Sequence, residues 1–265
     1  MQFLTDDHVK LVYTDEGDGQ PIIFLTGYSG IKEEWYFQRN FYVNHGYRVI
    51  TVDWRNHGES ARTGKNLTIK QLAADVNALI MHLKLDKVIL IGHSMGASVI
   101  WAYQSQYGET HIAIIITIDE SPKLTNDSEW QSGVRNLNAQ TMDFVLPTMM
   151  NQQMCMQPID SKLRQLLAQQ HESHFFDATL NAPLLANHAL SDWRQTLADL
   201  SIPQLIVTGE RSPIWQHDFC RYCEKVINGE SRVVTINQVG HMPQIEVPEK
   251  FNEITLDFIQ HKLGI

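Results

Sequence analysis

Cysteine is scarce in this chain, which excludes one class of small stabilised domains. Three cysteines occur among 265 residues, Cys155, Cys220 and Cys223, too few for a disulfide framework. Cys220 and Cys223 have CxxC spacing, but no further ligands at suitable spacing accompany them. The pattern therefore favours two cysteines on one predicted helix, residues 216–227, over a zinc site.

Positive charge is also in short supply. The chain has 21 Lys and Arg against 30 Asp and Glu, a formal net charge of −9. Nucleic acids and anionic membranes attract proteins that concentrate positive charge, and no such cluster is present. Binding to nucleic acid or an anionic membrane is therefore not expected.

Long hydrophobic runs are missing as well. The longest strongly apolar stretch, IAIIITI at 112–118, is about a third of a membrane span and indicates a buried strand. The first ten residues, MQFLTDDHVK, have neither the basic region nor the apolar run of a signal peptide. These features predict a cytoplasmic protein with no membrane insertion.

Short β-branched runs alternate with longer segments of helical periodicity. This alternation is typical of an α/β fold in which helices flank a mostly parallel sheet. Helices are expected at 68–85 and 248–263, where apolar residues recur on one helical face. Eight strands are expected, at 1–4, 9–17, 22–25, 48–53, 87–91, 112–118, 204–208 and 232–236.

The alternation stops between residues 122 and 201. This segment contains no convincing strand, helical stretches at 160–175 and 190–200, and five of the nine methionines. It is interpreted as a helical cap inserted into a core domain formed by residues 1–121 and 202–265.

The stretch VILIGHSMGAS carries the strongest chemical signal. A predicted strand leads into Gly92-His93-Ser94-Met95-Gly96, and a helix follows from about Ala97. G-x-S-x-G between a strand and a helix is the nucleophile elbow, which places a strained serine at the edge of a sheet. Ser94 is the predicted nucleophile, and the backbone N–H of Met95 is a predicted oxyanion donor.

A serine nucleophile needs a base, and His241 fits best among twelve histidines. It follows the last predicted strand, in a Gly-His-Met-Pro loop, so it lies over the same sheet edge as Ser94. His93 is expected to turn away around the elbow. The other histidines considered are predicted on helix surfaces or at the surface of the insertion; they are His82, His261, His171, His174 and His188.

These motifs resemble the α/β-hydrolase-fold family over the whole chain. The resemblance rests on GHSMG, on VDWRNHGES after the fourth strand, on GHMPQIEVPEKF near the end, and on the helical insertion at the place of the family's cap. The family often has D-x-R-G-H-G-x-S where Asn56 stands here, a segment that builds the loop under the active site. It is therefore interpreted as structural.

The resemblance also implies a second oxyanion donor in the loop FLTGYSG. Thr26 replaces the histidine that the family usually has before the glycine, and the Gly27-Tyr28 backbone is retained. The Tyr28 N–H is the implied donor. The Tyr28 ring and Ser29, with Trp35 as a further candidate, are then expected to face the pocket.

The carboxylate that would orient His241 is not at its commonest family position. Three residues after the glycine that ends the seventh strand, this chain has Ser212. Glu210 is expected to point away and pair with Arg211, and Asp218 is expected on a helix, too distant.

Some family members place the acid after the sixth strand, where this chain has DESPKLTND. Asp119 is preferred there because Glu120, the alternative, is turned to the opposite side by strand alternation. The stretch resembles a subgroup with an Asp before a Ser/Thr-Pro pair. A weak or absent acid is the remaining alternative.

The insertion supplies a methionine-rich run at 142–156 that suits a pliable acyl or aryl pocket, although methionines in a cap are also ordinary core. Trp130 and Trp193 are further candidates for aromatic walls. The predicted pocket residues are Gly27, Ser29, His93, Met142, Met149 and Trp215.

A serine nucleophile favours acyl transfer. The leading hypothesis is a carboxylesterase acting on small to medium apolar acyl or aryl esters. Thioesterase, lactonase, carbon–carbon hydrolase and perhydrolase chemistry stay open, as does a ligand-binding or sensory protein with weak or no turnover. No metal or cofactor motif is present, so none is expected. The partner would be a small-molecule ester, and the sequence leaves open whether the chain forms a homodimer.

Overall fold

The computed structural model describes residues 1–215 and 218–264. An eight-stranded sheet forms the centre, with helices on both faces, which confirms the predicted α/β architecture. The strand order is β1-β2-β4-β3-β5-β6-β7-β8. The strands are β1 (Gln2–Leu4), β2 (Lys10–Glu16), β3 (Gln20–Leu25), β4 (Tyr47–Val52), β5 (Val88–His93), β6 (Ile112–Ile118), β7 (Gln204–Gly209) and β8 (Arg232–Ile236).

The sheet is parallel except at one edge, where β1 pairs antiparallel with β2 and β2 with β4. From β4 to β8 every pairing is parallel, so the carboxyl ends of β3, β5, β6 and β7 lie at one edge. In open α/β sheets this edge is where ligands bind.

The helices are assigned as follows. They are η1 (Lys32–Trp35), α1 (Tyr36–Asn44), α2 (Ile69–Leu83), α3 (Met95–Tyr107), α4 (Met142–Val145), η2 (Leu146–Asn151), α5 (Ser161–Ser173), α6 (Ala178–Leu190), α7 (Arg194–Asp199), α8 (Cys220–Val226), α9 (Pro243–Glu246) and α10 (Pro248–Leu263).

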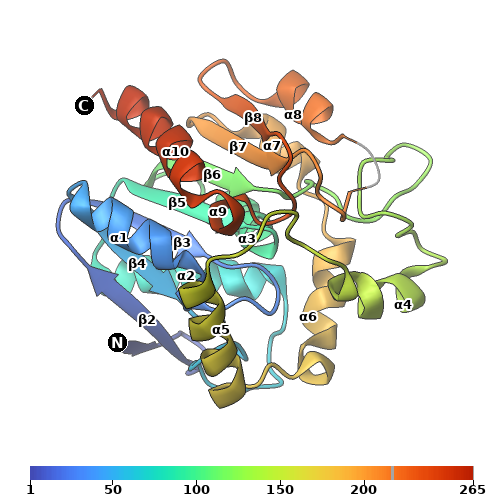
Figure 1. Ribbon diagram of the computed structural model, residues 1–265, viewed down its shortest axis with the longest axis horizontal. Helices are drawn as coiled ribbons and strands as arrows, with labels where there is room; N and C mark the ends of the chain where they lie inside the picture. The colour runs from blue at the N-terminus through green and yellow to red at the C-terminus, as the bar shows by residue number, and fades with distance from the viewer. Residues whose placement is uncertain (216–217, 265) are drawn as a thin grey trace.

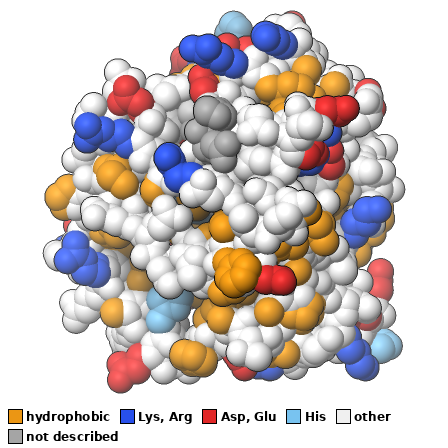
Figure 2. Space-filling view, turned by 90° about the vertical axis from the view of Figure 1, so that its right-hand side faces the viewer, with side chains coloured by type: hydrophobic (Ala, Val, Ile, Leu, Met, Phe, Trp, Pro, Cys, Tyr) orange, Lys and Arg blue, Asp and Glu red, His pale blue; other side chains and the backbone are white. Residues whose placement is uncertain are grey.

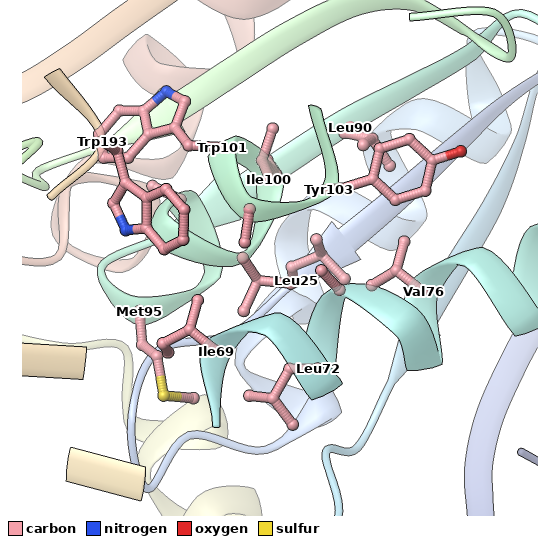
Figure 3. Packing of buried hydrophobic residues seen from close by; sticks show 14 of the residues in the cluster. Leu25, Ile69, Leu72, Val76, Leu90, Met95, Ile100, Trp101, Tyr103 and Trp193 are labelled. Atoms are coloured by element: carbon pink, nitrogen blue, oxygen red, sulfur yellow. The ribbon is translucent and has the colours of Figure 1, made fainter. Parts of the chain in front are cut away.

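Two apolar clusters hold the helices on the sheet. On one face, Tyr42 of α1 and Phe251 of α10 pack against strand residues such as Phe24. On the other face, α2 and α3 pack on the sheet and on each other. Figure 3 shows Leu72 and Val76 of α2 beside Leu25 of β3 and residues of α3. These buried faces fix α3, which begins at the nucleophile elbow.

Helices dominate residues 122–201, and within this segment the structure shows isolated β-bridges but no strand. Helices α5 and α6 run alongside the sheet in Figure 1, with α4 beyond them. α5 and α7 correspond to predicted helices, and α6 is a helix that the sequence reading did not anticipate. The division into core and cap stays a prediction.

Cys220 and Cys223 lie on α8, as expected, while Gln216 and His217 of the predicted 216–227 helix lie outside the described residues. Among the described residues, no helix is both long enough and apolar enough to cross a membrane.

Candidate active site

The nucleophile elbow has the strained backbone that its sequence predicts. Ser94 lies between β5 and α3 with φ 51° and ψ −124°, in the left-handed half of backbone space that side chains rarely adopt. A Cβ at Gly92 would lie 2.5 Å from the Gly96 carbonyl oxygen, and one at Gly96 2.4 Å from the Leu25 carbonyl oxygen. Only glycine fits on either side, so the turn and the half-buried position of the serine at the sheet edge depend on both.

The loop after β3 approaches the elbow closely. A Cβ at Gly27 would lie 3.2 Å from the Cβ of Ser94, so a side chain there would crowd the nucleophile. The next two residues, Tyr28 and Ser29, line the same cavity as Ser94. The oxyanion role of the Tyr28 and Met95 backbone N–H groups stays a prediction.

The WRNHG segment, interpreted above as structural, supports this loop directly. The Ser29 N–H donates to Nε2 of His57 (3.1 Å), and Nδ1 of the same ring bonds the Arg55 carbonyl oxygen (2.9 Å). Burial lowers the pKa of His57 to about 4, so the ring is neutral at ordinary pH and keeps an acceptor at Nε2. The Tyr28 ring packs edge-on against His57.

The structure brings His241 and Asp119 together. Nδ1 of His241 lies 2.6 Å from Oδ2 of Asp119, and both side chains are buried. Asp119 directly follows β6 and has φ 46°, a strained conformation that turns its carboxylate toward β7 and the histidine loop. The Asp119 N–H donates to the Val207 carbonyl oxygen (2.8 Å), which anchors this turn on the neighbouring strand.

The residue at the usual place of the acid is part of the same network. The Ser212 hydroxyl donates to Oδ2 of Asp119 (2.6 Å), as does Nε1 of Trp215 (3.1 Å). The Gly209 N–H (3.2 Å) and the Thr208 hydroxyl donate to Oδ1. The loop after β7 therefore supplies hydrogen-bond donors to the Asp119 carboxylate.

The other acid candidates have different partners. Glu120 faces Ser98 and His188, away from His241. Glu210 accepts from the Gln238 N–H (2.9 Å), which corrects the expected pairing with Arg211. Asp218 accepts from the Cys220 N–H (2.9 Å) at the start of α8.

His93 lies closer to the site than expected. Its Nε2–H donates to the His241 carbonyl oxygen (2.9 Å), and the two ring centroids are 4.6 Å apart. Burial lowers the pKa of His93 well below its ordinary value, so this ring is neutral. The expectation that it turns away around the elbow is wrong, because the ring is held under the His241 loop.

A cavity of about 120 Å³ joins these residues. Apolar side chains such as Leu185 and Ile214 form much of its wall. Seven of the predicted site residues line it: Gly27, Tyr28, Ser29, His93, Ser94, Met149 and His241.

A second cavity, of about 590 Å³, adjoins the first and shares Tyr28, Ser29 and Leu185 with it. Met142, predicted in the pocket, lines this second cavity together with residues of η2 and α6. The side of the molecule that carries α4 faces the viewer in Figure 2, and hydrophobic side chains gather around its centre. Phe144 of α4 is 77% exposed.

The predicted aromatic walls are elsewhere. Trp215 lines a separate cavity of about 330 Å³ beside Ser212, because its indole N–H is turned to Asp119. Trp35 packs on Phe24 in the core. Trp130 packs edge-on against Tyr222 and donates to the Lys123 carbonyl oxygen, and Trp193 lies against Trp101 in the core (Figure 3).

Sequence reasoning missed two ionisable residues of the cavity wall, Glu34 and His188. Glu34 of η1 lines the cavity, and burial raises the pKa of its carboxyl group to about 8. His188 of α6, expected at the surface, is 3% exposed and also lines the cavity. No local motif marks either residue, since both reach the site through packing between distant elements.

No metal site is evident in the described part of the chain. No group of three or more His, Cys, Asp or Glu residues there is arranged to hold a metal ion. Cys220 and Cys223 are both buried, and burial raises the pKa of both thiols.

The chain belongs to the alpha/beta hydrolase fold family, whose model matches residues 20–248. One similar protein is the AB hydrolase superfamily protein YisY of Bacillus subtilis (strain 168), 28% identical over 260 residues that cover 96% of this chain and 97% of the relative. A non-heme haloperoxidase of Rhodococcus erythropolis is 36% identical over 130 residues, 49% of this chain and 47% of that protein.

Solved structures share the fold over the full length. An esterase (EaEST) from Exiguobacterium antarcticum superimposes with a TM-score of 0.86 at 22% identity, covering 98% of this chain and 99% of that one. A bromoperoxidase from Bacillus anthracis superimposes with a TM-score of 0.84 at 21% identity, covering 98% and 100%.

Proposed function

We propose that this protein is a serine hydrolase, most specifically a carboxylesterase, with Ser94 as nucleophile, His241 as base and Asp119 as acid. The observation that carries the proposal is the buried 2.6 Å contact between His241 Nδ1 and Asp119 Oδ2, beside the strained Ser94 in one small cavity. Membership of the alpha/beta hydrolase fold family supports hydrolytic chemistry.

The geometry suits a two-step acyl transfer. Nδ1–H of His241 donates to the Asp119 carboxylate, which leaves a lone pair on Nε2. Nε2 takes the proton of Ser94 Oγ as that oxygen attacks the ester carbonyl, and the N–H groups of Tyr28 and Met95 stabilise the oxyanion. The proton passes to the departing alcohol, and water then attacks the acyl-enzyme with His241 as base, which releases the acid.

The cavity supports a substrate of modest size. A volume of about 120 Å³ around Ser94 accommodates a small acyl group, and the adjoining apolar space of about 590 Å³ accommodates a longer or aryl portion. We therefore favour small to medium esters. Thioesters, lactones and carbon–carbon bonds present the same kind of carbonyl and remain alternative substrates.

A panel of p-nitrophenyl esters of increasing chain length tests the proposal. We expect turnover by the wild type and a loss of at least about 10⁴-fold in kcat for Ser94→Ala, as for other serine hydrolases that lose the nucleophile. A chelator should not change the rate. Absence of turnover across esters, thioesters and lactones would favour a ligand-binding or sensory protein that kept the fold.

Cofactor-free perhydrolysis is the second candidate, favoured by the partial similarity to a non-heme haloperoxidase. Hydrogen peroxide would replace water in attacking the acyl-enzyme, giving a peracid and free Ser94. Carboxylate-dependent bromination of monochlorodimedone with peroxide and bromide, lost in Ser94→Ala, would support it. Ester hydrolysis without any brominating activity would exclude it.

A further inference from the structure

A buried polar cluster joins α6 to the core beside the candidate active site. Nε2 of His188 lies 2.9 Å from Oε1 of Glu120 and 3.1 Å from the Ser98 hydroxyl, which itself donates to Oε1 of Glu120 (3.1 Å). All three side chains are buried. None of the three has a part in the acyl-transfer scheme above.

The cluster leaves one polar atom unused. An ionised carboxylate only accepts hydrogen bonds, so the His188 proton that faces Glu120 is on Nε2. The other ring nitrogen, Nδ1, is buried and has no hydrogen-bond partner among the described residues. Most buried polar groups in proteins are paired, and an unpaired one costs about 1–3 kcal/mol, so an orphan atom on a residue that lines a cavity indicates a missing partner.

The position of the ring places that partner near the reacting bond. His188 lines the same cavity as Ser94 and His241. It contacts Ser98 in the first turn of α3, the helix that begins directly after Ser94. A group bound at His188 would therefore be a few bonds from the scissile carbonyl.

The other residues that line the cavity indicate which kind of substrate group His188 would bind. No Lys or Arg is among the described residues that line the cavity, while Glu34 is. An anionic substrate group would therefore meet no permanent positive charge. A hydroxyl group suits Nδ1 in both forms of the ring, because it can donate to a neutral imidazole and accept from a protonated one.

We propose that His188, held by Glu120 and Ser98, is a substrate-binding residue that hydrogen-bonds a hydroxyl group of the ester through Nδ1. This inference rests on the proposed esterase function and adds a substrate class, esters that carry a hydroxyl group within a few bonds of the carbonyl. His188 then sets specificity, and His241 remains the base.

Matched esters test the proposal. Methyl 3-hydroxybutanoate and methyl 3-methylbutanoate differ by a hydroxyl in place of a methyl on the acyl side, and 2-hydroxyethyl acetate and propyl acetate do so on the alcohol side. We expect the wild type to favour the hydroxylated member of one pair about tenfold in kcat/KM, the effect of one hydrogen bond. His188→Leu should abolish that preference.

Two further variants separate binding from folding. His188→Gln keeps a side chain that can bond Glu120 and guards against a variant that does not fold. His261→Leu is a matched control, since His261 is exposed on α10 and lies outside the cavity lining. It should leave the preference unchanged. A purely structural role for His188 would lower the melting temperature of both His188 variants without changing the ratio.

A binding measurement keeps this inference separate from the proposed function. Ser94→Ala should bind the favoured hydroxylated ester about tenfold more tightly than its isostere by calorimetry, and the double variant with His188→Leu should not. Equal binding and equal kcat/KM within both pairs would overturn the inference even if ester turnover is confirmed. A preference for monomethyl succinate over both acyl-side esters would also overturn it, since it would identify a carboxylate site.

Discussion

The Asp119 carboxylate accepts hydrogen bonds from five donors, and four of them come from the last two residues of β7 and the loop that follows. Oδ2 alone is shared by His241, Ser212 and Trp215. Charge-assisted bonds of this kind fix a carboxylate in one orientation. Ser212 thus contributes to the site by holding an acid that is attached to the neighbouring strand.

Asp119→Asn should lower kcat by about 10³- to 10⁴-fold, with the protein still folded. The amide NH₂ group would replace one carboxylate oxygen, so a hydrogen-bond donor would face the donors that bond that oxygen now. His241 would lose the partner that keeps its proton on Nδ1. Steady-state hydrolysis of a p-nitrophenyl ester measures the loss of kcat, and circular dichroism shows whether the variant is folded.

Glu210→Gln is the matched control, a carboxylate-to-amide change at an exposed residue that bonds Gln238. It should keep kcat within about twofold. Full activity in Asp119→Asn together with loss of activity in Glu120→Gln would show that the acid has been assigned to the wrong neighbour.

For single residues, the sequence reveals local motifs but not the partners against which a side chain packs. Ser94 and His241 stand in local sequence patterns, and Asp119 follows from the adjacency of β6 and β7 in the sheet. The roles of Trp215 and His188 depend on where loops and α6 fold back over the sheet. The residues next to Trp215 and His188 in the sequence do not indicate how these segments fold over the sheet.

Glu246 connects the histidine loop to the stretch of chain between η2 and α5. One of its carboxylate oxygens accepts from the N–H groups of Met156 (2.7 Å) and Gln157 (2.9 Å), and the other from the Gly240 N–H (2.9 Å). The His241 N–H also donates to the Met154 carbonyl oxygen (2.8 Å). This short element, α9 and the loop before it, sets the position of the base.

Glu246→Ala should lower kcat about tenfold or more and also lower the melting temperature, because one buried and two partly buried backbone N–H groups lose a charged acceptor. Esterase kinetics and thermal unfolding measure the two effects. Glu249→Ala, at an exposed glutamate two residues into α10, is the control. Wild-type kinetics in Glu246→Ala would mean that the loop holds His241 without this carboxylate.

Helices and strands could be predicted where the pattern of apolar residues in the sequence was regular. The strands and α2, α5 and α10 lie within a few residues of their expected bounds. Short β-branched runs mark the strands, most of which are buried on both faces, and apolar residues at helical spacing mark the helices. α6 was missed because Pro183 lies inside it and because its one buried face includes two polar residues, Asn181 and His188, while Leu190 is exposed. A buried stripe that mixes polar and apolar side chains gives only a weak amphipathic pattern in the sequence.

The whole molecule carries a buried acid whose ionisation opposes folding. Burial raises the pKa of Glu34 to about 8, above its ordinary value, so the folded protein holds a proton that the unfolded chain has lost. This contribution to stability is present at low pH and is lost as the pH rises from about 4.5 to about 8.

Glu34→Gln removes this titration. The free energy of unfolding of the wild type should fall relative to that of Glu34→Gln between about pH 5 and pH 9, by up to a few kcal/mol. Urea unfolding of both proteins across this range measures the difference. Glu224→Gln, at an exposed glutamate of α8, controls for the substitution itself. A pH-independent difference between wild type and Glu34→Gln would contradict the burial argument.

At the scale of the whole molecule, the proposed function requires that the sheet edge present Ser94 to His241 as an activated nucleophile. Labelling with a fluorophosphonate, followed by mass spectrometry of the peptide that contains VILIGHSMGAS, tests it most directly. We predict a single adduct on Ser94, absent in Ser94→Ala and strongly slowed in His241→Ala. No adduct on the folded protein, or an adduct on another residue that survives Ser94→Ala, would contradict the account.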